Sequence, residues 1–173
     1  MAIIFNTERL VVRQFTVADQ EHFFRLNGDE QVMRYIRATS TREQSDKFLA
    51  ENIDAYRANQ QRGRWAVEEK GTGRLVGSFA IIPITGQPEK TQLGYSLTPE
   101  NWGKGYASEL TISGLAHFFS TENIPEIYGI TEIPNVASQK VLLKAGFRQA
   151  GTFTEGDKEL LLFVARRNEQ VTG

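Results

Sequence analysis

The chain has 173 residues, of which 40% are hydrophobic and 24% are charged, a composition typical of a folded globular protein. Twenty Lys and Arg residues against 21 Asp and Glu residues give a formal net charge of -1, which argues against a nucleic-acid partner bound through its phosphate backbone. The lack of Cys excludes disulfides and thiolate chemistry, and two His residues are too few for a zinc site, so we expect no metal cofactor.

Chain length and the N-terminal residues set the expectations for domain number and location. No internal repeat is present, and the polar stretch 85–91 is too short for a linker, so we expect a single domain over residues 1–173. The N-terminus lacks a basic start followed by a long apolar run, and no segment approaches about 18 consecutive apolar residues. We therefore expect a cytoplasmic protein without a membrane partner.

The first third of the chain predicts a strand followed by two helices. Residues 8–14 are rich in β-branched side chains, as strands are. Thr16 and Asp19 then form a helix-capping pattern ahead of several apolar residues. Ser40 and Glu43 form a second capping pattern, which predicts a helix with one apolar face that ends near residue 60.

The middle of the chain predicts a β-meander followed by a helix. Residues 65–70, 74–82 and 91–97 are strand-like and are joined by connections of hairpin length, so we expect three antiparallel strands. Apolar residues then recur at helical spacing from Ala107 to Phe118, which predicts a buried helix.

The last third predicts a strand, a helix and two more strands. Residues 126–131 are strand-like, and Asn135 is placed to begin a helix that Gly146 would end. Residues 147–154 and 159–166 complete the chain as strands. The sequence therefore predicts an α+β protein with a mixed central sheet of about seven strands flanked by helices.

A loop with two glycines, residues 102–107, is the clearest candidate binding site. Gly103 and Gly105 carry no side chain, so the backbone can approach a ligand closely, and the first turn of the following helix offers N–H groups to an anion. A Walker A loop would need its lysine after the second glycine, whereas Lys104 lies between them, and Ser108 stands where a dinucleotide fingerprint has a third glycine. The alternative is a tight turn that binds nothing.

Three segments of the chain resemble the GNAT superfamily of N-acetyltransferases. They are TERLVVRQFTVADQEHFF, LGYSLTPENWGKGYASEL and NVASQKVLLKAGF, and within the superfamily they are similar to the Rim-type branch of ribosomal-protein N-terminal acetyltransferases. The resemblance covers nearly the whole chain. It implies a GNAT-like acyl-CoA N-acyltransferase fold, acetyl-CoA as cosubstrate without a metal, and transfer of the acetyl group to a primary amine.

The resemblance also implies where the pyrophosphate of acetyl-CoA binds. In the family, a Gln/Arg-x-x-Gly-x-Gly/Ala loop binds it through backbone N–H groups. Here Gly105 and Ala107 match this pattern and Trp102 departs from it. Because the contacts come from the main chain, the departure leaves the prediction in place. The residues expected to hold the pyrophosphate are Trp102, Gly103, Lys104, Gly105, Tyr106 and Ala107.

The pantetheine arm is expected along the strand before this loop. By resemblance, residues 93–97 are the bulged central strand of the family, whose N–H near Ser96 or Leu97 polarises the thioester carbonyl. Asn135 would reach the pantetheine arm, and Ser138 would lie near the sulfur. The remaining residues expected to bind the cofactor are therefore Tyr95, Ser96, Leu97, Asn135 and Ser138.

Thioester aminolysis needs a base for the amine and an acid for the departing thiolate. The tyrosine that many family members use as the acid is absent, because Leu142 occupies its region, so Ser138 is the candidate acid. Its alternative role is a helix-terminal serine bonded only to the backbone. The family often has a Glu where this chain has Gln92, so Glu132 is the candidate base. The alternatives are a solvated carboxylate at a strand end, and a water chain that carries the proton.

Several acceptors are compatible with these residues. The Rim-type resemblance implies a protein N-terminal α-amine, and the alternative enzyme acts on a small amine such as a polyamine, an amino acid or an antibiotic. A non-catalytic acyl-CoA-binding or sensing module is a further alternative, motivated by Gln92 and the missing tyrosine. Trp65, Tyr35 and Tyr56 are candidates for the acceptor pocket or for the core. The resemblance implies a homodimer, although the sequence identifies no exposed apolar edge to form it.

Overall fold

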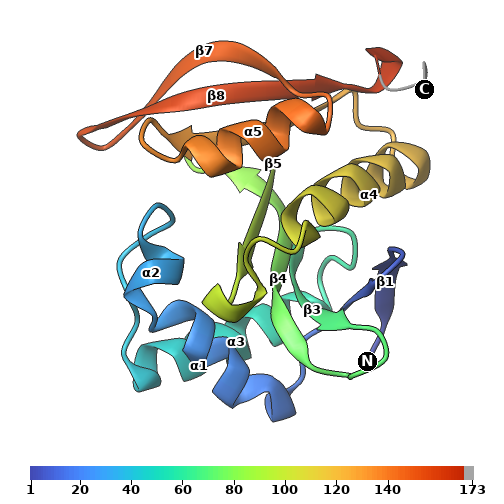
Figure 1. Ribbon diagram of the computed structural model, residues 1–173, viewed down its shortest axis with the longest axis vertical. Coiled ribbons are helices and arrows are strands. Elements are labelled where there is room, and N and C mark those ends of the chain that lie inside the picture. The colour runs from blue at the N-terminus through green and yellow to red at the C-terminus, as the bar shows by residue number, and fades with distance from the viewer. Residues whose placement is uncertain (170–173) are drawn as a thin grey trace.

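The computed structural model describes residues 1–169, which form an eight-stranded sheet with helices on both faces (Figure 1). The strands are β1 (Ile3–Asn6), β2 (Leu10–Arg13), β3 (Gly63–Glu69), β4 (Leu75–Ile84), β5 (Gln87–Leu97), β6 (Glu126–Glu132), β7 (Arg148–Glu155) and β8 (Lys158–Arg166). The helices are α1 (Gln20–Asn27), α2 (Glu30–Met33), α3 (Arg42–Ala55), α4 (Tyr106–Thr121) and α5 (Val136–Lys144). The predicted α+β class and mixed sheet are confirmed.

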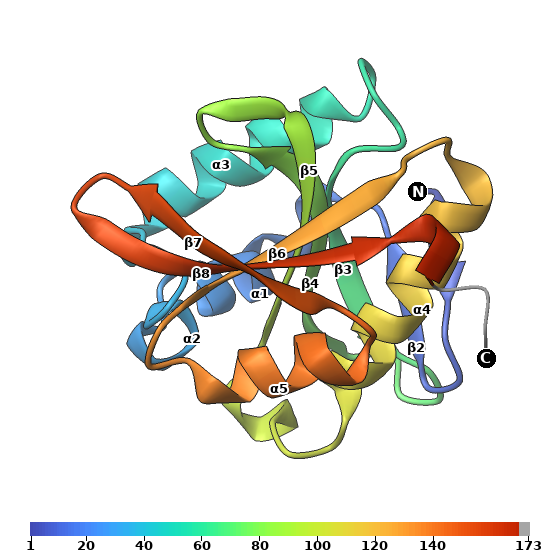
Figure 2. The same ribbon diagram turned by 90° about the horizontal axis from the view of Figure 1, so that it is seen from above.

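The sheet consists of two halves that separate between β5 and β6. The strand order is β1-β2-β3-β4-β5-β6-β8-β7, and β5 and β6 are the parallel neighbours in an otherwise antiparallel sheet. Within residues 1–169, β5 and β6 pair only at Gln92 and Tyr128. Figure 2 shows the β6-β8-β7 half running across the direction of β3, β4 and β5. Beyond Gln92, the edge of β5 that faces β6 therefore has no partner strand.

Two short elements near the N-terminus were not predicted. β1 pairs with β2 through a turn in which the Thr7 N–H donates to the Leu10 carbonyl at 2.9 Å, which raises the number of strands to eight. α2 is a single helical turn whose first N–H groups bond to the Asp29 carboxylate. Both elements span four residues, which is too short for hydrophobic periodicity to distinguish a strand or a helix from a turn.

The cap of α3 lies one residue later than predicted. The Thr41 hydroxyl accepts from the Gln44 N–H at 3.2 Å and the Gln44 amide accepts from the Thr41 N–H at 2.9 Å, so this pair forms the capping box. The Ser40 N–H instead donates to the Asn27 carbonyl at 2.8 Å. The pairs Ser40/Glu43 and Thr41/Gln44 both satisfy the capping pattern, so the pattern alone did not fix the register. The helix ends at Ala55 rather than near residue 60.

β5 begins within the polar stretch 85–91, whereas the sequence predicted a strand only from residue 91. The strand starts at Gln87, and its first residue pairs with Ile84 of β4. The connection is a two-residue turn in which Gly86 adopts a left-handed φ of +79°. Polar residues continue into β5 because this end of the hairpin is largely exposed to solvent.

The core lies between the sheet and α4. Trp65 is fully buried and stacks on Phe118, with ring centroids 5.6 Å apart, and Phe79 is also fully buried there. A Cβ on Gly114 of α4 would lie 2.4 Å from the Phe79 ring, so the helix packs closely on the sheet. Tyr56 is buried and its hydroxyl accepts from the Phe15 N–H at 3.1 Å. Trp65 and Tyr56 therefore belong to the core rather than to an acceptor pocket.

Alternate residues of β3 point to the opposite face, which α1 and α3 cover. Phe15, Phe23, Leu49 and Ala66 form a second buried cluster there. None of the helices in residues 1–169 is long and apolar enough to cross a membrane.

Candidate active site

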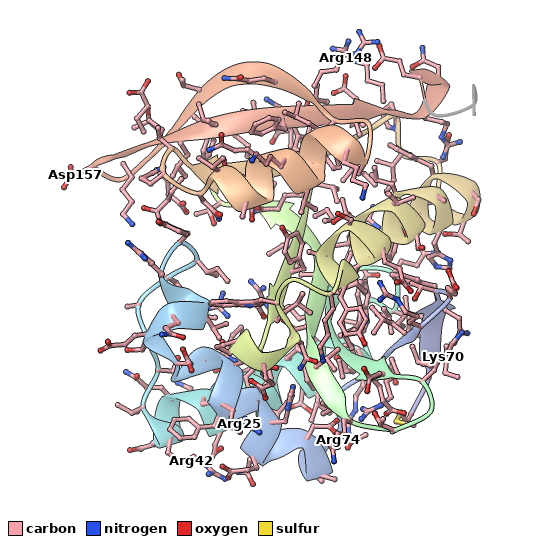
Figure 3. The ribbon with its side chains drawn as sticks, in the orientation of Figure 1. Arg25, Arg42, Lys70, Arg74, Arg148 and Asp157 are labelled. Carbon is pink, nitrogen blue, oxygen red and sulfur yellow. The ribbon has the colours of Figure 1, made fainter. Side chains whose placement is uncertain are left out.

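A cavity of about 380 Å³ opens where β5 and β6 separate. Its walls come from the loop after α2, from β3, β4 and β5, from the end of β6 and the start of α5, and from the β7–β8 hairpin. In Figure 3, Asp157 marks the tip of this hairpin, and side chains surround an open space between the hairpin and the loop after α2. Five of the predicted site residues line the cavity: Tyr95, Ser96, Glu132, Asn135 and Ser138.

The Tyr95 and Ser138 hydroxyls meet at the β5 side of the cavity. Their oxygens are 3.0 Å apart, so Ser138 does not bond only to the backbone. Burial raises the pKa of Tyr95, against an opposing effect of the Ser138 hydrogen bond, so the phenol stays protonated at neutral pH. The Asn135 side chain accepts from the Ser138 N–H at 3.3 Å and so caps α5. The structure thus holds a pair of neutral proton donors here.

The free edge of β5 presents backbone amides to the cleft. The Thr98 N–H donates to the Val76 carbonyl at 3.0 Å, and the Leu97 carbonyl accepts from the Trp102 indole at 2.9 Å. Because successive peptide groups along a strand point to opposite sides, the N–H groups of Leu97 and Tyr95 face away from β4. The geometry therefore favours Leu97 over Ser96 as the amide that contacts a bound thioester.

The bulge expected in residues 93–97 is not observed. β4 and β5 keep one continuous register from the pair Gly77–Leu97 to the pair Pro83–Thr91, and the register shifts only after that, between Pro83 and Ile84. The free edge arises because β6 diverges from β5 after a single residue pair, so no irregularity of β5 itself is needed.

The loop 102–107 connects β5 to α4 in the geometry of an anion site. Gly103 and Gly105 have φ values of +73° and +82°, in the left-handed region that favours glycine. Gly105 is the N-cap of α4, and no side chain within residues 1–169 caps this helix. The N–H groups of the first helical turn therefore keep their hydrogen-bonding capacity, together with the positive end of the helix dipole.

Arg9 braces this loop from the β1–β2 turn. One guanidinium nitrogen donates to the Lys104 carbonyl at 2.9 Å and another to the Glu109 carboxylate at 2.7 Å. The guanidinium lies 4.6 Å from the centroid of the Tyr106 ring. The Lys104 ammonium is turned toward Asn101, at 2.9 Å from its amide oxygen. Sequence reasoning missed Arg9, since 95 residues separate it from Lys104 and no motif contains both.

Glu132 lies at the end of β6 and faces the cavity from the second half of the sheet. Its Oε1 accepts from the Lys158 ammonium at 3.1 Å, and 22% of its side chain is exposed. Gln92, which stands where the family often has a Glu, also lines the cavity, and its amide lies 3.4 Å from the Pro83 carbonyl. No group of three metal-ligating side chains is found in the described part of the chain.

The wall of the cavity opposite α5 was largely missed by sequence reasoning. It is formed by residues far apart in the chain, of which only Tyr35 was a candidate: Met33, Tyr35, Ile36, Arg37, Arg64, Ala80 and Gly94. Arg64, Ala80 and Gly94 form one row across β3, β4 and β5. A Cβ on Gly94 would meet nothing within 4 Å, so small residues keep this floor open.

Comparison with known proteins identifies relatives over nearly the whole chain. An uncharacterized N-acetyltransferase, YoaA of Bacillus subtilis, is 29% identical over 155 residues, which cover 88% of this chain and 86% of that protein. A GNAT-family acetyltransferase from Bacillus anthracis has a similar structure, with a TM-score of 0.83 at 26% identity over 98% of this chain and 100% of that one.

Two more distant structures share the fold. The RimL acetyltransferase of ribosomal protein L7/L12, in complex with coenzyme A, gives a TM-score of 0.77 at 16% identity, covering 95% of this chain and 98% of that one. Spermidine N-acetyltransferase of Vibrio cholerae, in complex with CoA and spermine, gives a TM-score of 0.77 at 20% identity, covering 94% of this chain and 98% of that one. At these identities the similarity shows the fold alone.

The sequence profile of the acetyltransferase (GNAT) domain matches residues 9–148, which include the glycine loop, the free edge of β5 and Ser138. This match, together with the relatives and the fold, shows that the chain belongs to the GNAT family and is an acetyl-CoA-dependent acetyltransferase.

Proposed function

We propose that this enzyme transfers the acetyl group of acetyl-CoA directly to a primary amine held in the cavity between β5 and β6. The observation that carries the proposal is the continuity of the site. The free edge of β5 leads from the cavity to the glycine loop, and the hydroxyl pair of Tyr95 and Ser138 lies beside that edge. A pantetheine arm along this edge, with its pyrophosphate at the loop, would place its thioester at the cavity.

In this proposal the glycine loop and the first turn of α4 bind the pyrophosphate through the backbone N–H groups of Gly103 to Ala107, because the Trp102 N–H already donates to the Pro99 carbonyl at 3.1 Å. The Leu97 N–H donates to the thioester carbonyl and stabilises the oxyanion that forms when the amine attacks. Asn135 holds the start of α5 against the pantetheine arm, so that Ser138 lies at the sulfur.

The proton transfers follow from the same placement. Ser138 donates its proton to the departing thiolate and regains one from Tyr95, whose phenol is protonated at neutral pH. The second proton that the nitrogen loses as the amide forms returns to Tyr95 through water. Glu132, on the opposite wall, accepts the proton of the attacking ammonium directly or through water. Lys158 bonds to its Oε1, and its Oε2 makes no hydrogen bond within residues 1–169.

The acceptor that we propose is a small amine or a peptide N-terminus, since a cavity of about 380 Å³ is large enough for a small molecule or the end of a peptide. The Rim-type segments and the fold shared with RimL support the peptide N-terminus. The fold shared with spermidine N-acetyltransferase supports a small amine.

The function is tested by CoA release with a panel of peptides, amino acids and polyamines. A thiol reagent can follow the reaction continuously, because the chain has no Cys and contributes no thiol of its own. We expect at least one amine to raise CoA release above the rate of hydrolysis, with the acetylated amine identified by mass spectrometry. Tight CoA binding without release for any amine would favour the sensing module instead.

A further inference from the structure

Two arginines face the cavity without a carboxylate partner. Arg37, in the loop after α2, and Arg64, on β3, both line it. Among residues 1–169, neither forms an ion pair. Arg37 donates to the Asn27 amide oxygen at 2.6 Å, whereas no hydrogen bond is formed by the Arg64 guanidinium within the described residues. The fold thus places two positive charges at one wall and leaves them without a counter-ion.

Phe48 brings the two charges together. The guanidinium carbon of Arg37 lies 5.2 Å from the centroid of the Phe48 ring, and that of Arg64 lies 5.5 Å from it. Burial, and secondarily the charge of Arg37, lower the pKa of Arg64 to about 10, so both groups remain charged at neutral pH. The ring attracts each cation but neutralises neither. Arg64 is partly buried while Arg37 is exposed to solvent, so it is above all the charge of Arg64 that a bound anion would compensate.

The floor of the cavity connects these charges to the reaction site. Arg64 is level with Ala80 on β4 and with Gly94 on β5, and Gly94 precedes Tyr95. Adjacent strands lie about 4.8 Å apart, so the backbone of Arg64 is about 10 Å from the free edge of β5. Neither Ala80 nor Gly94 fills this interval, which an arginine side chain and a small molecule can share.

The acidic groups of the cavity belong to the other half of the sheet. Glu132 ends β6, and Glu155 ends β7 at the hairpin to β8. Glu132 is paired with Lys158, at 3.1 Å. Negative charge is therefore available to a substrate ammonium on one half, while positive charge is available on β3 and the loop after α2.

We propose that the cavity selects a primary amine that also carries an anionic oxygen group, a carboxylate or a phosphate, which Arg37 and Arg64 bind. The inference rests on the proposed function and narrows its substrate class. Acceptors that carry only positive charge, such as polyamines, are repelled by the same two side chains. Charge-assisted pairing with guanidinium groups orients the acceptor so that its amine points along the floor toward the thioester.

The test compares matched pairs of amines that differ in the anionic group: an amino acid against its amide, and phosphoethanolamine against ethanolamine. The ratio of kcat/KM values within each pair is measured for the wild type, Arg64→Gln, Arg37→Gln and Arg64→Lys. Comparing ratios between variants cancels the intrinsic reactivity of each amine. Arg34→Gln is the control, because it removes the same charge from the same loop at a residue that does not line the cavity.

We expect Arg64→Gln and Arg37→Gln each to lower the anionic-to-neutral ratio at least tenfold for one pair, with Arg64→Lys recovering part of the loss and Arg34→Gln unchanged. For the wild type, the pair of amines with the larger anionic-to-neutral ratio of kcat/KM shows whether the natural acceptor carries a carboxylate or a phosphate. Arg64→Gln should also melt at the same temperature as the wild type or higher in the absence of ligand, because it removes an uncompensated charge. A purely structural arginine would give a lower melting temperature instead.

The inference is overturned, and the proposed function kept, if spermidine is acetylated as well as the anionic amines and the ratios do not respond to either arginine. If no amine is acetylated, the proposed function fails, and the anion site is decided by calorimetry with the N-acetylated amino acid and CoA. The site is supported if the N-acetylated amino acid binds Arg64→Gln at least tenfold more weakly than it binds the wild type. The site is overturned if both proteins bind it equally well or if the wild type does not bind it. If Arg64→Gln does not fold, Arg37→Gln, which lies in a loop, gives the same readings.

Discussion

The glycine loop, which follows β5, and the wall of the cavity that carries Arg37 and Arg64 are built from different parts of the amino acid. The glycine loop offers main-chain N–H groups from a contiguous stretch, and its two glycines set the backbone conformation. The arginine wall consists of the side chains of Arg37, from the loop after α2, and Arg64, from β3, with Phe48 of α3 between the two cations. A main-chain site keeps its ligand through most substitutions, whereas a side-chain site changes its ligand with one or two.

Substitution of Gly105 tests the main-chain site and has the largest expected effect. If the loop binds the pyrophosphate as proposed, Gly105→Glu places a carboxylate against it, and Gly105→Gln introduces the same bulk and the same strain at φ +82° without the charge. We expect calorimetry to show CoA binding about 100-fold weaker for the Glu variant than for the Gln variant, as repulsion between neighbouring charges near a protein surface predicts. Equal CoA affinities for the two variants would remove the loop from the cofactor site.

Asp19 tests the scaffold under the arginine wall. Its carboxylate accepts from Arg13 at 2.9 and 3.0 Å and fixes the turn into α1, which packs on α3. Since Glu68 still pairs with Arg13, we expect Asp19→Asn to lower the free energy of unfolding by about 2 kcal/mol. In the control, Asp46→Asn breaks a more exposed pair with Arg42 and should cost less than about 0.5 kcal/mol by urea unfolding.

The same ion pair predicts how stability depends on pH. Burial of Asp19 opposes ionisation, but the hydrogen bonds from Arg13 and Thr16 prevail and hold its pKa below the usual carboxyl range. Its contribution is therefore complete above the pKa of an unfolded Asp, and is lost as the pH falls through the lower folded-state value. The wild type should lose its advantage over Asp19→Asn in that acidic range, and a stability difference that grew on acidification would contradict the pairing.

Tyr95 and Ser138 test the proposed reaction centre. We expect Tyr95→Phe and Ser138→Ala each to lower kcat about tenfold with unchanged CoA affinity, because a thiolate is a good leaving group and gains modestly from a proton donor. The double variant should be only slightly slower than either single one, since the two hydroxyls form one relay. Tyr128→Phe on β6, whose hydroxyl bonds to Glu126, is the control. Additive losses would show that the hydroxyls act separately.

Gly94 tests the floor of the arginine wall and has the smallest expected effect. Space is open at its Cβ position and its φ is not left-handed, so Gly94→Val should fold normally and narrow the path from Arg64 to β5. We expect the KM of the amine to rise about fivefold, with CoA affinity unchanged, as for a pocket narrowed by one side chain. Gly94→Ala should give a smaller change in the same direction. A loss of CoA affinity would instead place the cofactor on this floor.

The sequence predicted the elements and contacts that are encoded locally. Hydrophobic periodicity located the long helices and seven of the eight strands, and the spacing around Gly105 located the start of α4. The register of the α3 cap was wrong by one residue because neighbouring residues satisfy the same pattern. The expected bulge was wrong because the separation of β5 and β6 is a property of two strands that the local sequence of β5 does not contain.

Contacts between distant segments account for what the sequence did not predict. Arg9 braces the glycine loop, and Arg37 and Arg64 meet on Phe48, only because the fold brings separate elements together. Trp65 and Tyr56 are aromatic residues of the kind that line pockets as well as cores. Their burial depends on the packing of α4 and α3 against the sheet, which their residue type does not reveal. Ser138 and Asn135, in contrast, share one helix start, which the capping pattern predicted and which the family resemblance placed at the cofactor.

The single residue pair between β5 and β6 has a consequence for how the enzyme can evolve. In the proposed function, the coenzyme lies along the free edge of β5, and its amides complete the ladder of hydrogen bonds there. Substitutions that lengthened the pairing of β6 would strengthen the apoprotein and displace the coenzyme by the same hydrogen bonds. We therefore expect selection for thermal stability to act elsewhere in the molecule and to leave the pairing between β5 and β6 short.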